Sequence, residues 1–199
     1  ARFGTPIMEG VYLDEFLEDL GDEAPDVQPG DMDLIGQPLD VLTINGYCPA
    51  NVIPYDNKRG YRVLPVPRSY PTYVPKWLRF GPNILYWVPR FATEVWDAKA
   101  IYITENGCAC DDVQDADGNV YDTDRVLYLR QHFIAMSRAI AEGYPLKGYF
   151  LWSFIDNFEW AEGYSQRFGI TWCNFETLQR VPKFSARWYG EVIKNGHVV

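Results

Sequence analysis

The spacing of apolar residues predicts four helices. In the clearest, residues 124–142, apolar side chains recur at alternating intervals of three and four residues, which places them on one face. They are Val126, Leu129, Phe133, Met136 and Ile140. Asp122 or Thr123 is expected to cap this helix and Gly143 to end it. Three further helices are expected at residues 13–20, 82–96 and 184–194. A bend is expected at Pro89.

Apolar runs rich in β-branched and aromatic residues predict three strands, one ahead of each of the last three helices. They are DVLTINGY at residues 40–47, AIYIT at 100–104 and GYFLWSF at 148–154. This alternation predicts a parallel sheet with crossover helices in one domain, with no second domain. Residues 50–76 are rich in proline and predict a long irregular loop, a feature that is usually functional.

The charge balance narrows the range of partners. The chain has 18 Lys and Arg against 27 Asp and Glu, and residues 1–40 hold 11 acidic residues against the single base Arg2. No basic footprint for nucleic acid or an anionic membrane is present, and no apolar run approaches the roughly 18 residues of a membrane span. We expect no nucleic-acid partner, no membrane contact and a cytoplasmic protein, with secretion as the alternative.

The cysteines do not predict a disulfide framework or a metal site. The chain has four, and Cys108 and Cys110 flank one residue, a spacing at which a mutual bridge would be strained. Paired CxxC motifs are missing and the two histidines are distant in sequence, so reduced thiols are favoured over bridges or a metal. Residues 115–119 faintly resemble a calcium loop, but Gly118 comes two residues too early, which favours a surface turn.

Polar and aromatic residues stand where the three predicted strands end. The C-terminal ends of parallel strands are where such sheets and barrels bind ligands. Carboxylates and amides bond sugar hydroxyls, aromatic rings stack on pyranose faces, and a carboxylate can attack an anomeric carbon. The candidates are Asn45, Tyr47, Glu105, Trp152, Glu159 and Trp160.

Each candidate also has a simpler interpretation. Glu105 precedes an Asn-Gly turn signal and could be a solvated loop acid, and the aromatic residues could belong to the core. The combination of these residues at the ends of three successive strands favours a sugar site.

Five segments resemble the family 1 glycoside hydrolases, the retaining β-glycosidases of the β-glucosidase type. They are GTPIMEGVY at residues 4–12, LDVLTINGY at 39–47, IYITENG at 101–107, FLWSFIDNFEWAEGYSQRFGI at 150–170 and VPKFSARWY at 181–189. Together they span nearly the whole chain. They resemble the C-terminal portion of the family's single (β/α)8 TIM-barrel domain, so we expect residues 1–199 to contribute the last three β/α units, strands 6 to 8.

The resemblance also implies a role for each candidate, and no cofactor or metal. Glu105 would be the catalytic nucleophile, with Tyr47 donating its phenol to that carboxylate. The remaining implied roles are Asn45 near the sugar 2-hydroxyl, Trp152 as the floor of the glycone subsite, Glu159 on the 4- and 6-hydroxyls, Trp160 on the 3-hydroxyl and Phe168 near C6.

Two departures from the family pattern qualify this expectation. Gly46 stands where the family usually has an aromatic residue, and the Asn-Glu-Pro motif that supplies the acid/base Glu has no counterpart, because the chain has no Asn-Glu dipeptide. We therefore expect a fragment, split subunit or nicked piece whose companion polypeptide or missing N-terminal segment supplies strands 1 to 5 and the acid/base Glu. The expected activity is hydrolysis of terminal non-reducing β-D-glucosyl residues from β-glucosides; the alternative is an inactive sugar-binding fragment or paralogue.

Overall fold

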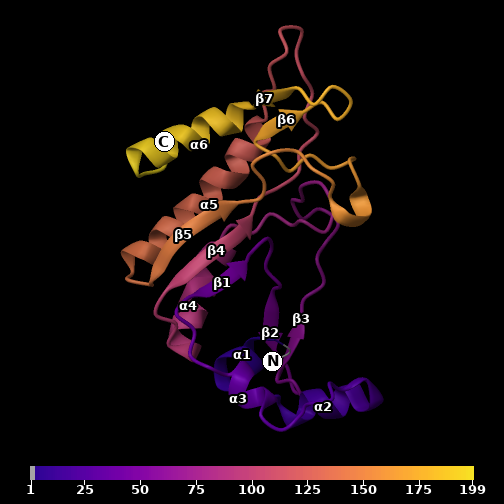
Figure 1. Ribbon diagram of the computed structural model, residues 1–199, viewed down its shortest axis with the longest axis vertical. Coiled ribbons are helices and arrows are strands. Elements are labelled where there is room, and N and C mark those ends of the chain that lie inside the picture. The colour runs from indigo at the N-terminus through magenta and orange to yellow at the C-terminus, as the bar shows by residue number, and fades with distance from the viewer. Residues whose placement is uncertain (1–2) are drawn as a thin grey trace.

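Three parallel strands form the centre of the computed structural model, which describes residues 3–199 (Figure 1). In spatial order they are β1 (Leu42–Asn45), β4 (Ile101–Asn106) and β5 (Leu146–Leu151). The three long helices are α4 (Ile84–Trp96) between β1 and β4, α5 (Thr123–Ala141) between β4 and β5, and α6 (Phe184–Asn195) near the C-terminus. The predicted alternation of strands and helices is confirmed.

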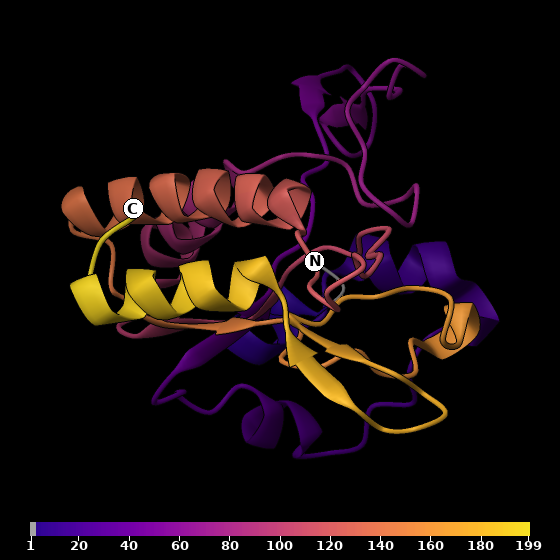
Figure 2. The ribbon, with the colours of Figure 1, turned by 90° about the horizontal axis from the view of Figure 1, so that it is seen from above.

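The helices cover one face of this sheet (Figure 2). Ile103 of β4 is fully buried against Leu85 of α4 and Leu146 of β5, so apolar contact fixes which face turns inward. The opposite face carries Thr43 and Phe150, both exposed. The sheet is therefore dry on its helical side and open on the other.

The predicted elements agree with the structure to within a few residues. The helix expected at 124–142 spans Thr123–Ala141 and the one at 13–20 is α2 (Asp14–Leu20). Pro89 lies inside α4, which continues beyond it. The third strand ends earlier than expected, because the backbone of Ser153 already bonds Phe168 rather than a neighbouring strand.

Several short elements were not predicted. Residues 50–76 are not irregular throughout, because they contain an antiparallel hairpin that projects away from the sheet and its helices (Figure 2). Three-residue strands are too short to show a period of two in the sequence. The unpredicted elements are α1 (Gly4–Glu9), η1 (Gly21–Glu23), α3 (Asp31–Ile35), β2 (Val52–Pro54), β3 (Tyr61–Val63), η2 (Trp160–Glu162), β6 (Thr171–Cys173) and β7 (Arg180–Pro182).

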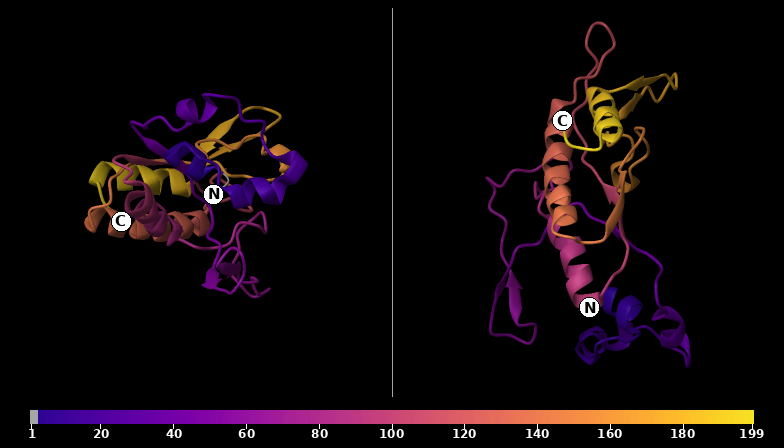
Figure 3. Two further views of the ribbon diagram at one scale, coloured as in Figure 1. Left: turned by 90° about the horizontal axis from the view of Figure 1, so that it is seen from below. Right: turned by 90° about the vertical axis from the view of Figure 1, so that its left-hand side faces the viewer.

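The N-terminal helices lie at the opposite end of the molecule from the β6–β7 hairpin (Figure 3). The indole of Trp96 donates a hydrogen bond to Glu9 at 2.9 Å, which ties α1 to the end of α4. Lys58 of the β2–β3 hairpin pairs with Glu18 of α2 at 3.2 Å. Surface contacts of this kind are worth at most about 1 kcal/mol each.

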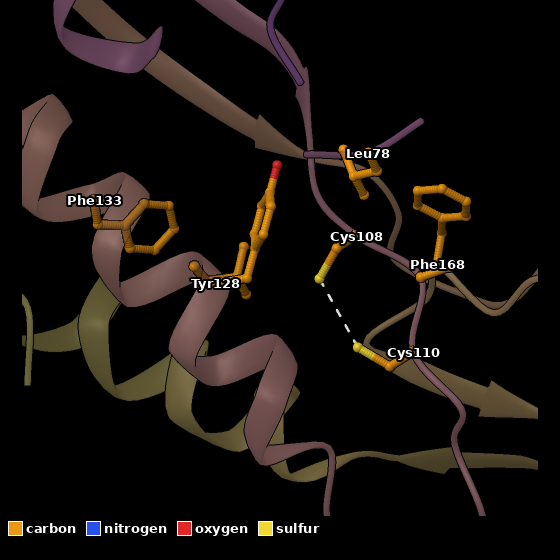
Figure 4. Packing of buried hydrophobic residues seen from close by; sticks show 8 residues of the cluster. Leu78, Cys108, Cys110, Tyr128, Phe133 and Phe168 are labelled. Atoms are coloured by element: carbon orange, nitrogen blue, oxygen red, sulfur yellow. Dashed lines mark hydrogen bonds between the residues drawn. The ribbon is translucent and has the colours of Figure 1, made fainter. Parts of the chain in front are cut away.

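The largest buried cluster lies under the C-terminal ends of the strands (Figure 4). It is built on Tyr128, Leu129 and Phe133 of α5, and the sulfur atoms of Cys108 and Cys110 within it lie 3.9 Å apart. The four cysteines are free. Over residues 3–199, no helix has the length and apolar character needed to cross a membrane.

Candidate functional site

The register of β1 and β4 brings the first two candidates together. Asn45 is the partner of Glu105 in the parallel ladder, and the backbone N–H of Gly46 donates to the Glu105 carbonyl at 2.8 Å. The chain then places the Tyr47 hydroxyl 2.8 Å from the Glu105 carboxylate, to which it donates a hydrogen bond. Two residues 58 positions apart thus form one unit.

Tyr47 is held as a neutral donor. Burial raises the pKa of its phenol, and the hydrogen bond to Glu105 and the nearby charge of Glu159 raise it further. The hydroxyl therefore keeps its proton at ordinary pH and can only donate to a carboxylate.

Asn45 and Glu105 are both accessible to solvent at the ends of their strands. The Asn45 side chain is exposed, and its carbonyl oxygen accepts a hydrogen bond from the Thr104 hydroxyl at 2.9 Å. Glu105 is half-buried. The amide and the carboxylate therefore project from neighbouring strand ends where a polar ligand has access.

Trp152 and Glu159 form a second unit beside the first. The Trp152 indole donates to the Glu159 carboxylate at 3.2 Å, which fixes the carboxylate at the edge of the ring. A Cβ atom at Gly107 would lie 1.7 Å from the Trp152 carbonyl oxygen, so only glycine lets the ends of β4 and β5 approach this closely.

A buried carboxylate closes the loop that carries Glu159. Asp156 accepts hydrogen bonds from the backbone of Gly169 at 3.0 Å, from Lys183 at 2.8 Å and from Arg167 at 2.6 Å. Because Asp156 lies near the start of the loop, Arg167 and Gly169 lie at its end and Lys183 caps α6, these bonds fix the loop at its base.

Two predicted residues are placed differently from the others. The Trp160 side chain is 82% exposed, whereas Phe168 is 2% exposed and belongs to the buried cluster against which Tyr47 and Trp152 pack. Figure 4 shows Phe168 near Leu78. Its position supports the site from below, and the sugar contacts implied for both residues stay predictions.

Comparison with known proteins identifies the family. Residues 1–198 match the model described as Glycosyl hydrolase family 1. The chain belongs to glycosyl hydrolase family 1. The 1,4-beta-D-glucan glucohydrolase of Thermotoga neapolitana is 42% identical over 97% of this chain, and beta-glucosidase A of Thermotoga maritima is 40% identical over 97%.

Solved structures agree with this assignment. The beta-glucosidase from Thermotoga maritima in complex with deoxynojirimycin superposes with a TM-score of 0.86 and 38% identity over 99% of this chain. The match covers 44% of that structure and 43% of each Thermotoga relative, in their C-terminal half. This family 1 chain therefore has the fold of part of a TIM barrel, as predicted.

Sequence reasoning missed two residues of the candidate site in this family 1 chain. Trp77 lies edge-on to Tyr47 with ring centroids 5.9 Å apart, and it is 48% exposed. It sits just beyond the proline-rich loop, where no periodicity marks it. Asn106, which the sequence presents as half of a turn signal, is fully buried and hydrogen-bonded to three side-chain and backbone partners.

The remaining buried acids of the family 1 chain are neutralised by cations rather than available to a metal. Lys183 binds Asp112 at 2.5 Å in addition to Asp156, and Arg125 binds Asp112 at 2.8 Å and also Asp122. Within residues 3–199 no group of three or more His, Cys, Asp or Glu side chains is arranged to hold a metal ion.

Proposed function

We propose that this chain supplies the nucleophile and the glycone subsite of a retaining β-glucosidase. The observation that carries the proposal is the 2.8 Å hydrogen bond from Tyr47 to Glu105 at the ends of adjacent parallel strands. A sugar-binding protein has no need of a carboxylate held by a phenol, whereas a nucleophile must be oriented and kept ionised.

The reaction is a double displacement. The Glu105 carboxylate attacks the anomeric carbon, a C–O bond to the enzyme forms, and the bond to the aglycone breaks as its oxygen takes a proton from a second carboxylic acid. Water, deprotonated by that same second group, then attacks the anomeric carbon and releases Glu105. Tyr47 holds the carboxylate throughout, and the product retains the β configuration.

In this proposal the glycone is an unphosphorylated glucosyl group. Trp152 supplies the floor, Glu159 binds the 4- and 6-hydroxyls and Asn45 lies near the 2-hydroxyl, with β-galactosides and β-fucosides as secondary substrates. The half-buried Glu159 supports this choice, because a 6-phosphate would meet a carboxylate there. Gln166 adds no positive charge to offset that repulsion.

The second carboxylic acid comes from outside this chain. No Asn-Glu dipeptide occurs here, and Glu159, bonded to Trp152, belongs on the glycone side of the scissile bond. The chain spans 43% of the length of the Thermotoga neapolitana relative. We infer that strands 1 to 5 and the acid/base Glu come from a companion polypeptide or an N-terminal segment. The alternative is an inactive sugar-binding paralogue.

The test uses a completed barrel: this chain preceded by the part of the Thermotoga neapolitana relative that it does not match. A 2-fluoro glucoside traps the covalent intermediate, and peptide mass spectrometry is expected to find the label on Glu105. Glu105→Gln should abolish labelling, while Glu162→Gln, which changes an exposed acid of η2, should keep it. A label elsewhere, or an inverted product, would refute the proposal.

The chain by itself is expected to be inactive. General acid help is worth about 10² to 10⁴ in rate, and an open sheet loses the positioning as well. Turnover of an aryl β-glucoside by residues 1–199 alone, at a rate near that of the completed barrel, would show that the chain contains its own acid. Binding of glucoside without turnover by the completed barrel would favour the paralogue.

A further inference from the structure

We propose that Asn106 is a positioning residue that holds Tyr47 in place to donate to Glu105. The inference rests on the proposed function and deepens it. Asn106 contacts neither the Glu105 carboxylate nor the Tyr47 hydroxyl in the hydrogen bonds of its side chain, so it acts through the backbone of the segment that carries Tyr47.

The Asn106 carboxamide is fully buried and its orientation is fixed by its neighbours. Its nitrogen donates to the Gly46 carbonyl at 2.7 Å and to the Tyr128 hydroxyl at 3.0 Å, and its oxygen accepts from the Tyr149 hydroxyl at 2.9 Å. Because a backbone carbonyl can only accept, the nitrogen must face Gly46. A buried amide with both ends satisfied has one stable orientation.

These bonds close a circuit around the nucleophile. The Tyr128 hydroxyl, which points from α5 toward the strand ends in Figure 4, donates to the Tyr47 carbonyl at 3.3 Å. The Tyr47 hydroxyl donates to the side chain of Glu105, whose own backbone is bonded covalently to Asn106. The path therefore runs from Asn106 through Tyr128 and Tyr47 back to Glu105.

The strand ladder alone does not set the position of Tyr47. β1 ends at Asn45, and the pairing of β1 with β4 shifts register between Ile44 and Asn45. The pairing of β4 with β5 shifts between Ile103 and Asn106. Where both ladders are irregular, one backbone bond holds Gly46 to Glu105, and the Asn106 and Tyr128 side chains supply further contacts to the carbonyls of residues 46 and 47.

The first experiment is a double-mutant cycle in the completed barrel, measured as kcat/KM on an aryl β-glucoside. Asn106→Ala is expected to weaken the hydrogen bond from Tyr47 to the Glu105 carboxylate. Because a hydrogen bond to a charged group is worth about 1.5–3 kcal/mol, kcat/KM should fall about tenfold to hundredfold. In a Tyr47→Phe background the same change should cost less than about threefold, because the hydroxyl it positions is already gone. Equal losses in both backgrounds would overturn the proposal.

Tyr128→Phe provides a second cycle if Asn106→Ala does not fold. It removes only the hydroxyl that reaches Tyr47, and its loss should likewise shrink in the Tyr47→Phe background. Tyr144→Phe is the matched control, because that hydroxyl bonds Glu94 far from the strand ends, and it should leave kcat/KM unchanged. A loss for Tyr128→Phe that is unchanged by Tyr47→Phe contradicts the proposal.

A spectroscopic readout separates this inference from the proposed function. With tyrosine labelled at the ring carbon that bears the oxygen, the NMR signal of Tyr47 reports its hydrogen bond and needs no turnover. Asn106→Ala should move that signal in the same direction as Glu105→Gln. If the completed barrel is inactive and the signal moves, the function is wrong and the positioning stands; an unmoved signal refutes the positioning in an active or an inactive barrel.

Discussion

Two buried networks lie side by side beneath the candidate site, and they are built from different chemistry. Where the strands end, neutral groups meet: the Asn106 amide, the hydroxyls of Tyr128 and Tyr149, and the backbone carbonyl of Tyr47, whose own hydroxyl binds Glu105. Where the loops return to the helices, charges meet, in pairs of carboxylates and cations. The charged members are Asp112, Asp122, Asp156, Arg125, Arg167 and Lys183.

The two networks hold different parts of the molecule: the neutral network positions the strand ends, and the charged network anchors the loops to the helices. Burial raises the pKa of all three tyrosines, so the neutral network keeps its donors over the whole ordinary pH range next to Glu105. The charged network joins loops to helices through buried ion pairs, and removing one partner leaves the other charge buried and unpaired, which is costly. The Glu105 side chain is thus positioned by groups that do not titrate, and the loop bearing Glu159 is fixed by ions.

The largest expected effect comes from breaking the charged network at Lys183. Lys183→Met leaves Asp112 and Asp156 each short of one buried cation, which is expected to lower the free energy of unfolding of the completed barrel by about 3–5 kcal/mol. Urea unfolding measures it. Lys194→Met is the control, since that lysine is 74% exposed and should change stability by less than about 0.5 kcal/mol. Equal effects at both sites would contradict the distinction.

Protonation of His132 at low pH is expected to destabilise the neutral network. Burial lowers its pKa to about 4, and its ring stacks on Tyr128 with centroids 3.9 Å apart. The unfolded chain binds the proton near pH 6.5 and the folded chain near pH 4, so this contribution to stability is complete above pH 6.5 and falls as the pH drops, by about 3 kcal/mol at pH 4.

The measurement is the difference in unfolding free energy between the completed barrel and its His132→Phe variant, followed from pH 7 to pH 4. Phe keeps an aromatic ring on Tyr128 and carries no titrating group. The same replacement at the exposed His197 controls for loss of an imidazole elsewhere. A difference that does not change with pH would show that His132 is not held neutral.

Tyr47→Phe should remove the hydrogen bond to Glu105, and its effect is expected to be smaller than those of the Lys183 and His132 changes. Loss of a hydrogen bond to a carboxylate is worth about 1.5–3 kcal/mol, so kcat/KM on an aryl β-glucoside is expected to fall by about ten- to 150-fold while the unfolding free energy changes less. A fall of less than twofold would mean that the bond does not serve the reaction.

The smallest expected effect is at Gly46, where the chain departs from the family pattern. A Cβ atom there would lie 3.5 Å from Leu85, an ordinary contact, and the backbone is not in the left-handed region. Gly46→Ala should leave the melting temperature unchanged or raise stability by up to about 1 kcal/mol. Gly107→Ala is the contrasting variant, because its Cβ would collide with the Trp152 carbonyl oxygen, and it is expected to lower the stability. Comparable losses at both glycines would contradict this reading of the strand ends.

The sequence predicted the elements whose apolar residues repeat with a clear period, and it predicted the polar residues that stand at strand ends. Helix α5 was located to within one residue because its apolar positions recur over about four turns. Glu105 was placed by a strand end and a motif. The Asp122 cap was placed correctly in sequence but not in contact, because its carboxylate binds Arg125 and Ser185 instead of the helix backbone. That outcome depends on residues 63 positions away.

What the sequence could not predict depends on contacts between distant segments. The β2–β3 hairpin is too short for a period, and Trp77 reaches Tyr47 only because the loop folds back. The residues next to Asn106 in the sequence do not distinguish a turn from a buried bridge, since its partners are Gly46 just after β1, Tyr128 of α5 and Tyr149 of β5. Roles on the sugar, such as those of Trp160 and Phe168, remain predictions.

The open sheet has a consequence for how the protein is produced. Over residues 3–199, β1 and β5 are edge strands, each with a free row of backbone donors and acceptors, beside exposed Phe150 on the uncovered face. Such edges pair with other copies and lead to aggregation. When residues 1–199 are produced alone, this self-association competes with completion of the sheet by further strands. The completed barrel is consequently expected to give more soluble protein than residues 1–199 produced alone.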